Sequence, residues 1–155
     1  MGLDEDFAHA FLKAQLAANV KLPSSGVVFL SVRDHDKARL PELGAMFIDA
    51  GFTLLATDGT CNTLREAGLE CAHVHKVHEG QPNAVDAMIN EEIHLVVNTV
   101  EGQKAIDDSK SLRRTALIRK IPYHTTLASA FAVAQAIKAS QTGALTVASL
   151  QSYAA

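Results

Sequence analysis

The sequence predicts an α/β domain with a three-layer, doubly wound sheet of about five mainly parallel strands and helices on both faces. Short apolar segments alternate with segments of helical periodicity, as in parallel sheets whose crossovers are helices. The first expected strand, Val27–Leu30, is apolar throughout, which is typical of a strand buried on both faces. The chain has 155 residues, 48% of them hydrophobic, which is enough for one compact core.

The expected elements follow from periodicity and from turn residues. A helix over Asp6–Ala18 precedes a break at 21–26, and a second helix from about Asp36 to Ala50 ends at Gly51. The tail after Gly143 fits either a last strand or a packed extension. The remaining expected elements are strand Phe52–Ala56, the turn Thr57–Thr60 opening a helix to Ala67, strand Cys71–Val74, helix Asn83–Asn90, strand His94–Asn98, helix Lys104–Arg119, a short strand at Tyr123 and helix Thr126–Lys138.

Composition and charge exclude several classes of function. The net charge is −3, with 14 Lys+Arg against 17 Asp+Glu, so the basic surplus typical of nucleic-acid binding is missing. No apolar run approaches the roughly 18 residues of a membrane span, and the N-terminus is acidic where a secretory signal is basic. The two cysteines, Cys61 and Cys71, fall in segments expected to be buried. We therefore expect a cytoplasmic protein with neither nucleic-acid nor membrane partners.

Polar side chains follow the expected strands and should meet at one edge of the sheet. Two lysines and two threonines around one helix start suit a phosphate group, because helix amides and Gly59 let the anion approach the backbone. The alternative is that the threonines cap a helix and the lysines are solvated. The converging residues are Ser31, Lys37, Thr57, Thr60, Lys76, Asn98 and Thr99.

Metal and catalytic signatures are weak. His73, His75 and His78 form a His-x-His-x-x-His cluster, but only Glu79 adds a ligand at close spacing, so no metal site is expected. The sequence has no Gly-x-Ser-x-Gly elbow, Walker A loop or Gly-x-Gly-x-x-Gly fingerprint. We therefore expect no catalytic residue in this chain.

Several ordered motifs resemble those of the methylglyoxal-synthase-like domain that ends the large subunit of carbamoyl-phosphate synthases. The resemblance covers about Gly26–Val147. It divides the chain into residues 1–25, which look like the end of a preceding synthetase domain and a linker, and residues 26–155, the methylglyoxal-synthase-like domain. The motifs are Ser31-Val32-Arg33-Asp34-His35-Asp36-Lys37, Ala56-Thr57-Asp58-Gly59-Thr60, Lys76-Val77-His78-Glu79-Gly80, Val97-Asn98-Thr99, and Asp108-Ser109 with Arg113-Arg114.

This resemblance implies an allosteric domain that binds nucleotide monophosphates, with UMP as inhibitor and IMP as effector in some members. It implies that carbamoyl phosphate synthesis, which feeds pyrimidine and arginine biosynthesis, occurs in other domains of a parent ligase. ATP and Mg would act there, with no cofactor in this chain. The implied partners are the preceding synthetase domains and the glutaminase small subunit, and self-association is left open.

The resemblance also assigns residues. It places the effector phosphate on Lys37, Thr57, Thr60 and Lys76, and the base or ribose on Ser31, Asn98, Thr99 and Asp108. In some bacterial members ornithine activates the enzyme, and the matching residues here are Tyr123 and Thr125. Two departures leave the effector and ornithine preferences open: Val100-Glu101 replaces a common Thr-Ser, and position 124 is His where some members have Asp.

The alternative function is that of methylglyoxal synthase, which has the same fold and eliminates phosphate from dihydroxyacetone phosphate. That family places an aspartate base in a Gly-Gly-Asp segment, whereas Val77–Pro82 here has no aspartate. Only Glu79 or His78 could substitute for it. A purine-pathway cyclohydrolase of the same fold would need a Lys-Thr-Leu-His-Pro segment, which the sequence lacks.

Overall fold

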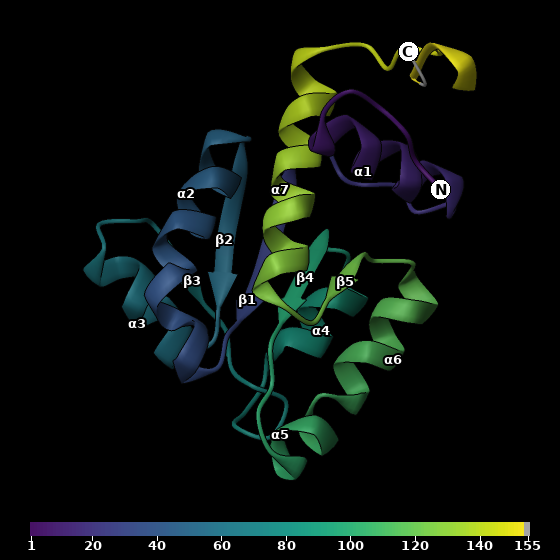
Figure 1. The fold of residues 1–155 in the computed structure, drawn as a ribbon. Helices are drawn as coiled ribbons and strands as arrows, with labels where there is room; N and C mark the ends of the chain where they lie inside the picture. The colour runs from purple at the N-terminus through teal and green to yellow at the C-terminus, as the bar shows by residue number, and fades with distance from the viewer. Residues whose placement is uncertain (154–155) are drawn as a thin grey trace.

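The computed structural model describes residues 1–153, without the side chains of Lys104 and Asp108. Within these residues five parallel strands form one sheet in the order β3-β2-β1-β4-β5 (Figure 1). The predicted parallel, doubly wound architecture is therefore confirmed. The strands are β1 (Gly26–Ser31), β2 (Phe52–Ala56), β3 (Ala72–His73), β4 (Leu95–Asn98) and β5 (Tyr123–His124).

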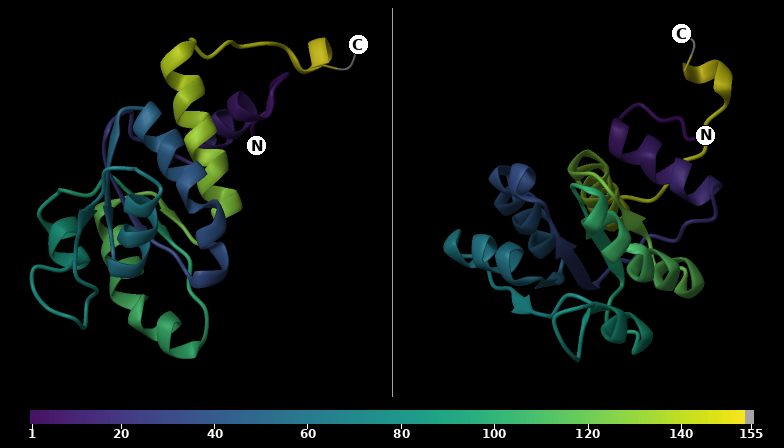
Figure 2. Two further views of the ribbon diagram at one scale, coloured as in Figure 1. Left: turned by 90° about the vertical axis from the view of Figure 1, so that its left-hand side faces the viewer. Right: turned by 90° about the horizontal axis from the view of Figure 1, so that it is seen from below.

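Helices cover both faces of this sheet, which gives the three layers that the sequence predicts (Figure 2). Helices α2, α3 and α7 pack on one face, and α4 and α6 pack on the other. The helices are α1 (Phe7–Ala17), α2 (Leu40–Asp49), α3 (Asp58–Glu66), α4 (Ala84–Ile89), α5 (Gln103–Asp108), α6 (Lys110–Arg119) and α7 (Leu127–Thr142), with 3₁₀ turns η1 (Asp34–Arg39) and η2 (Leu150–Tyr153).

Strand β1 explains why its sequence is apolar throughout. Val28 and Leu30 join the hydrophobic cluster formed with α2 and α7, while Phe29 joins the cluster formed with α4 and α6. All three side chains are fully buried. A central strand covered on both faces leaves no position for a polar side chain before its carboxyl end, where Ser31 stands.

Two predicted helices are wrong in detail. The helix expected from Asp36 is a 3₁₀ turn up to Arg39, and α2 begins at Leu40 with Pro41 in its first turn. Proline has no backbone N–H group and cannot donate the hydrogen bond that a preceding helical turn would require. Pro41 therefore favours a helix that starts at this point. The helix expected over Lys104–Arg119 is broken at Ser109, whose hydroxyl donates to the Ile106 carbonyl oxygen at 2.8 Å and so competes with the helical hydrogen bonds.

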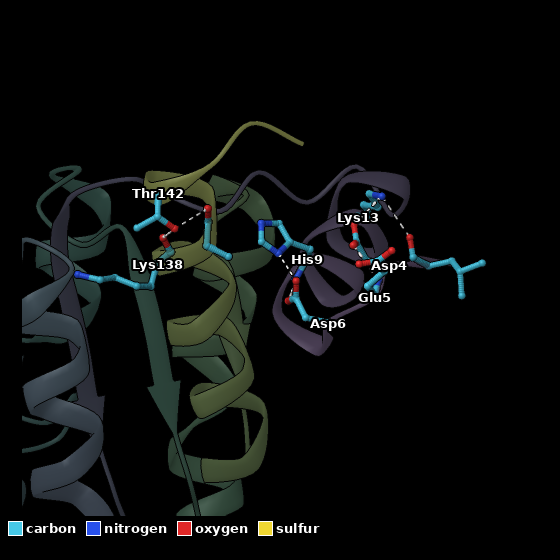
Figure 3. Close-up of polar contacts among 9 residues, drawn as sticks. Asp4, Glu5, Asp6, His9, Lys13, Lys138 and Thr142 are labelled. Carbon is cyan, nitrogen blue, oxygen red and sulfur yellow. Dashed lines mark hydrogen bonds and ion pairs between the residues drawn. The ribbon is translucent and has the colours of Figure 1, made fainter. Parts of the chain in front are cut away.

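The two ends of the chain lie together beside α7 (Figures 1 and 2). Helix α1 packs along α7 and buries Leu12. A hydrogen bond between His9 Nδ1 and Asp6 at 2.6 Å and an ion pair between Lys13 and Asp4 at 2.6 Å tie this helix to the segment before it (Figure 3). Helix α7 continues beyond the predicted Lys138 to Thr142.

The tail after Gly143 forms no strand within residues 144–153, and its residues 144–152 are all exposed, Val147 fully so. Leu145 to Ala148 share a shallow hollow with Leu3 and Lys13 of the N-terminal segment. The strand alternative is therefore wrong for residues 144–153, and the exposure of the tail does not support the packed extension either.

Both cysteines are buried, as the sequence predicts, and both are free thiols. The Cys61 thiol donates to the carbonyl oxygen of Cys71 at 3.5 Å, and burial raises the pKa of the Cys71 thiol to about 12. Among the helices of residues 1–153, none has both the length and the apolar character that a bilayer span requires.

The strand order places β1 between β2 and β4: the chain adds β2 and β3 on one side of β1, then returns to add β4 and β5 on the other side. The loops after these strands diverge at the carboxyl end of the sheet and leave a crevice there, which is where parallel α/β sheets bind ligands.

Candidate functional site

A cavity of about 870 Å³ lies at the carboxyl end of the sheet. The side chain of Asp108, assigned to the base or ribose, lies outside the described part of the structure. Tyr123 and Thr125 are not among the described residues that line the cavity. The seven other residues predicted for phosphate, base or ribose all line it: Ser31, Lys37, Thr57, Thr60, Lys76, Asn98 and Thr99.

The turn between β2 and α3 contributes two buried hydroxyl groups. Thr57 and Thr60 are only 3% and 2% exposed. Thr57 is the N-cap residue of α3, yet its side chain makes no capping hydrogen bond; its hydroxyl instead donates to the Ser31 hydroxyl at a long 3.4 Å. Thr60 accepts a hydrogen bond from the Val32 amide at 3.0 Å. The helix-capping alternative therefore does not account for the Thr57 hydroxyl.

Lys37 places its ammonium group over the start of the same helix. A Cβ atom on Gly59 would lie 3.0 Å from Lys37 Nζ, so the Lys37 side chain uses the space that the glycine leaves open. The first amides of a helix carry partial positive charge and are not used within the helix. The start of α3 therefore combines free amides, two hydroxyl groups and one ammonium group, which is a favourable arrangement for an anion.

The two lysines of the cavity are paired with acidic side chains. Lys37 Nζ lies 2.6 Å from Asp34 Oδ1, and Lys76 Nζ lies 3.7 Å from Glu79 Oε1. The hydrogen bond from Lys37 lowers the pKa of the Asp34 carboxyl, and the charge of Lys76 contributes to the same effect. Both lysines line the same cavity.

Buried polar side chains from β4 form the opposite wall. Asn98 donates to the Tyr123 hydroxyl at 2.7 Å, and Thr99 accepts a hydrogen bond from the Arg33 amide at 3.0 Å. Arg33 also donates to Asp36 at 2.8 Å, and this hydrogen bond, together with one from Thr99, lowers the pKa of the Asp36 carboxyl. The network ties the loop after β1 to the end of β4 and fixes the orientation of Asn98 and Thr99.

Sequence reasoning did not assign the apolar floor of the cavity to the site, nor four of its charged lining residues, Arg33, Asp34, Glu79 and Glu101. Most of the floor side chains belong to the core or pack against it, so no local pattern separates them from ordinary packing residues. Asp34 stands three residues before Lys37 within a polar loop, a spacing that could have indicated the ion pair. The floor residues are Phe29, Val77, Ala84, Ala105 and Leu112.

The histidine cluster does not form a metal centre among the described residues. His73 Nε2 lies 2.6 Å from Asp58 Oδ1, and the rings of His73 and His75 meet edge to face at 5.1 Å. His78 lines the cavity. Over the described part of the chain, no three His, Cys, Asp or Glu side chains come together as metal ligands would.

A five-stranded parallel sheet with helices on both faces and a polar cavity at its carboxyl end defines the class of doubly wound α/β domains. Within this class the chain belongs to the family of MGS-like domains, whose family model matches residues 39–125.

The most similar curated proteins that we compared are carbamoyl phosphate synthase large chains. The protein from Rhizobium meliloti (strain 1021) is 51% identical over 153 residues, which are 99% of this chain and 13% of that protein. The protein from Acidobacterium capsulatum is 48% identical over 151 residues, 97% of this chain and 14% of that protein. The protein from Campylobacter jejuni is 45% identical over 154 residues. This chain thus spans about an eighth of the length of the curated relatives that it matches.

Proposed function

We propose that this chain is the regulatory domain of a carbamoyl phosphate synthase large chain and that its cavity binds a nucleoside monophosphate. UMP is the inhibitor that we expect, with IMP as the alternative effector. The observation that carries the proposal is the gathering of seven predicted side chains around one cavity. The identity to large chains over nearly the whole sequence supports the choice of parent.

In this proposal the effector phosphate binds at the start of α3. The Thr57 and Thr60 hydroxyls and the first amides of α3 donate to its oxygens, while Lys37 and Lys76 balance its charge. The base and ribose lie toward Ser31, Asn98 and Thr99, with Asp108 as a further partner. The apolar floor offers a surface on which a flat base can pack.

The proposed parent performs its chemistry outside this chain. Residues 26–155 are the regulatory domain, and residues 1–25 are the end of a preceding synthetase domain and its linker. ATP and Mg act in the synthetase domains, and a glutaminase small subunit supplies ammonia in the holoenzyme. Tyr123 and Thr125 remain the proposed contacts for ornithine at the junction with the preceding domain; Thr125 is exposed there.

Regulation then requires that the effector bind two global states of the parent with different affinity. A coupling free energy of about 1 to 3 kcal/mol is typical of allosteric proteins. Because linkage is reciprocal, ATP must change the affinity of the parent for UMP by the same factor by which UMP changes its affinity for ATP. This chain alone can bind the effector, whereas regulation needs the other domains.

Isothermal titration calorimetry of this chain with UMP, IMP and uridine tests the binding step. We expect saturable binding of UMP and binding of uridine that is at least about tenfold weaker, since a charge-assisted contact contributes roughly 1.5 to 3 kcal/mol. Equal affinities for UMP and uridine would contradict a phosphate site. In the complete large chain, Lys76→Ala should abolish inhibition by UMP and leave the uninhibited rate of carbamoyl phosphate synthesis intact.

A further inference from the structure

The cavity is electrically balanced, which is unusual for a site that binds an anion. Its charged lining residues are three cations and three carboxylates among the residues that the structure describes. Each cation has an acidic neighbour, so the phosphate end is not an open cationic pocket. The cations are Arg33, Lys37 and Lys76, and the carboxylates are Asp34, Glu79 and Glu101.

Asp34 stands at the mouth of the cavity, between Lys37 and solvent. Its carboxylate lies 2.6 Å from Lys37 Nζ, yet the side chain is 94% exposed, against 28% for Lys37. The charge of Lys76 also contributes to the lowered pKa of the Asp34 carboxyl. This carboxylate is therefore the counter-ion of Lys37, and because it is exposed it can turn into water without losing its hydration.

Glu79 holds the second lysine in a similar way. One oxygen lies 3.7 Å from Lys76 Nζ, and the other accepts a hydrogen bond from the Lys76 amide at 3.1 Å. This side chain is 42% exposed. The hydrogen bond to the backbone anchors Glu79, so its negative charge stays at the mouth of the cavity when Lys76 turns toward a ligand.

We propose that Asp34 and Glu79 set the charge of the ligand and restrict the cavity to a single phosphate group. This inference rests on the proposed function of the cavity as a nucleotide site. One phosphate dianion matches the two charges of Lys37 and Lys76 and replaces Asp34 and Glu79 as the partner of their ammonium groups, which costs little because exposed ion pairs are weak. A second phosphate meets Asp34 and Glu79 with no cation left to pair with it.

The test compares UMP with UDP by calorimetry at one low, fixed salt concentration. The proteins are the wild type, Asp34→Asn, Glu79→Gln and the matched control Glu42→Gln. Glu42 pairs with Arg39 at 3.2 Å through the same three-residue spacing, but neither residue lines the cavity. All three variants change the net charge by the same amount, so the control separates a local effect from a global one.

We expect Asp34→Asn and Glu79→Gln each to raise the affinity for UMP by about two- to fivefold, the range for an exposed ion pair. We expect each to tighten UDP by at least about threefold more than UMP, because like charges at a binding site are costly. The Glu42→Gln variant should match the wild type for both ligands. The differences should shrink at high salt, where exposed charges are screened.

An unchanged ratio of UMP to UDP affinity in both cavity variants, with UMP still bound by the wild type, overturns this inference and leaves the nucleotide site standing. Equal shifts in all three variants would assign the effect to net charge and also overturn it. If neither UMP nor UDP binds any of the four proteins, although each protein unfolds at the temperature of the native fold, then both the proposed function and this inference are overturned.

Discussion

The ammonium group of Lys37 occupies the space over Gly59 that any other residue would fill with its Cβ atom, at 3.0 Å from Nζ. This contact joins the 3₁₀ turn after β1 to the start of α3 and brings a positive charge to the helix amides. Gly59 is not among the glycines with positive φ, so its role is to provide space for the lysine rather than an unusual backbone conformation.

Replacing Gly59 with alanine should therefore separate binding from stability. The Gly59→Ala variant should be as stable as the wild type or more stable by up to about 1 kcal/mol, because alanine is the better helix former. Its affinity for UMP should fall several-fold, since Lys37 must move away from the helix start. Urea unfolding and calorimetry measure the two effects. A variant that binds UMP as tightly as the wild type would contradict this role of Lys37.

The Lys76→Ala variant tests which part of the ligand the second lysine contacts. UMP should lose roughly 1.5 to 3 kcal/mol of binding free energy, as expected for a charge-assisted hydrogen bond. Uridine lacks the phosphate and should bind as it does to the wild type. Equal losses of affinity for UMP and uridine would show that Lys76 contacts a part of the ligand other than the phosphate.

The two threonines of the β2–α3 turn should behave differently. Thr60→Val removes the acceptor of the Val32 amide and leaves a buried donor unpaired, so unfolding free energy should fall by about 1 to 3 kcal/mol. Thr57→Val removes only a long contact at 3.4 Å and should lower stability by less than about 1 kcal/mol. Both should weaken UMP. Urea denaturation of the pair, with Thr60→Ser as the conservative control, measures the difference.

His124 should make stability depend on pH. Burial lowers the pKa of its imidazole from 6.5 to about 4, and within the described part of the chain its Nε2 atom has no hydrogen-bond partner. Between these values the unfolded state binds a proton that the folded state excludes, so stability falls as the pH drops from about 6.5 to about 4.

Urea unfolding at about pH 7 and about pH 5 should show a loss of roughly 2 kcal/mol from this group, at about 1.4 kcal/mol per pKa unit. The His124→Gln variant should lack that part of the slope. Ser129 Oγ lies 2.6 Å from the other ring nitrogen, so Ser129→Ala removes this neighbour and should keep the slope. Identical pH slopes for the wild type and His124→Gln would contradict the assignment.

The chain should not form methylglyoxal from dihydroxyacetone phosphate. Two carboxylates that line the cavity are held by ion pairs, Asp34 with Lys37 and Glu79 with Lys76, and are poor candidates for a general base. A coupled assay for methylglyoxal measures this. Product formation that disappears in Glu79→Ala would establish the lyase alternative.

The fold was largely predictable because the burial of each strand and helix determines which of its positions are apolar in the sequence. Strand β1 is apolar at each position that contacts a helix layer, and its single polar end, Ser31, marks the edge where the site lies. The convergence of Lys37, Thr57 and Asn98 was predictable for the same reason, since parallel strands bring their carboxyl ends together.

Other features depend on contacts between residues that the hydrophobic periodicity of the sequence does not reveal. The break at Ser109 arises because a hydroxyl competes for the Ile106 carbonyl oxygen, and serine occurs inside many unbroken helices. The floor residue Leu112 has the pattern of any core leucine. The meeting of Lys37 and Lys76 at one cavity depends on how two loops approach each other in space.

A crystal structure of this chain with UMP tests the central claim most directly. The account predicts the phosphorus atom at the start of α3, within reach of the Thr57 and Thr60 hydroxyls and of both Lys37 and Lys76, with the base toward Asn98. UMP bound instead in the hollow between Leu3 and the C-terminal tail, or with its phosphate away from α3, would contradict it.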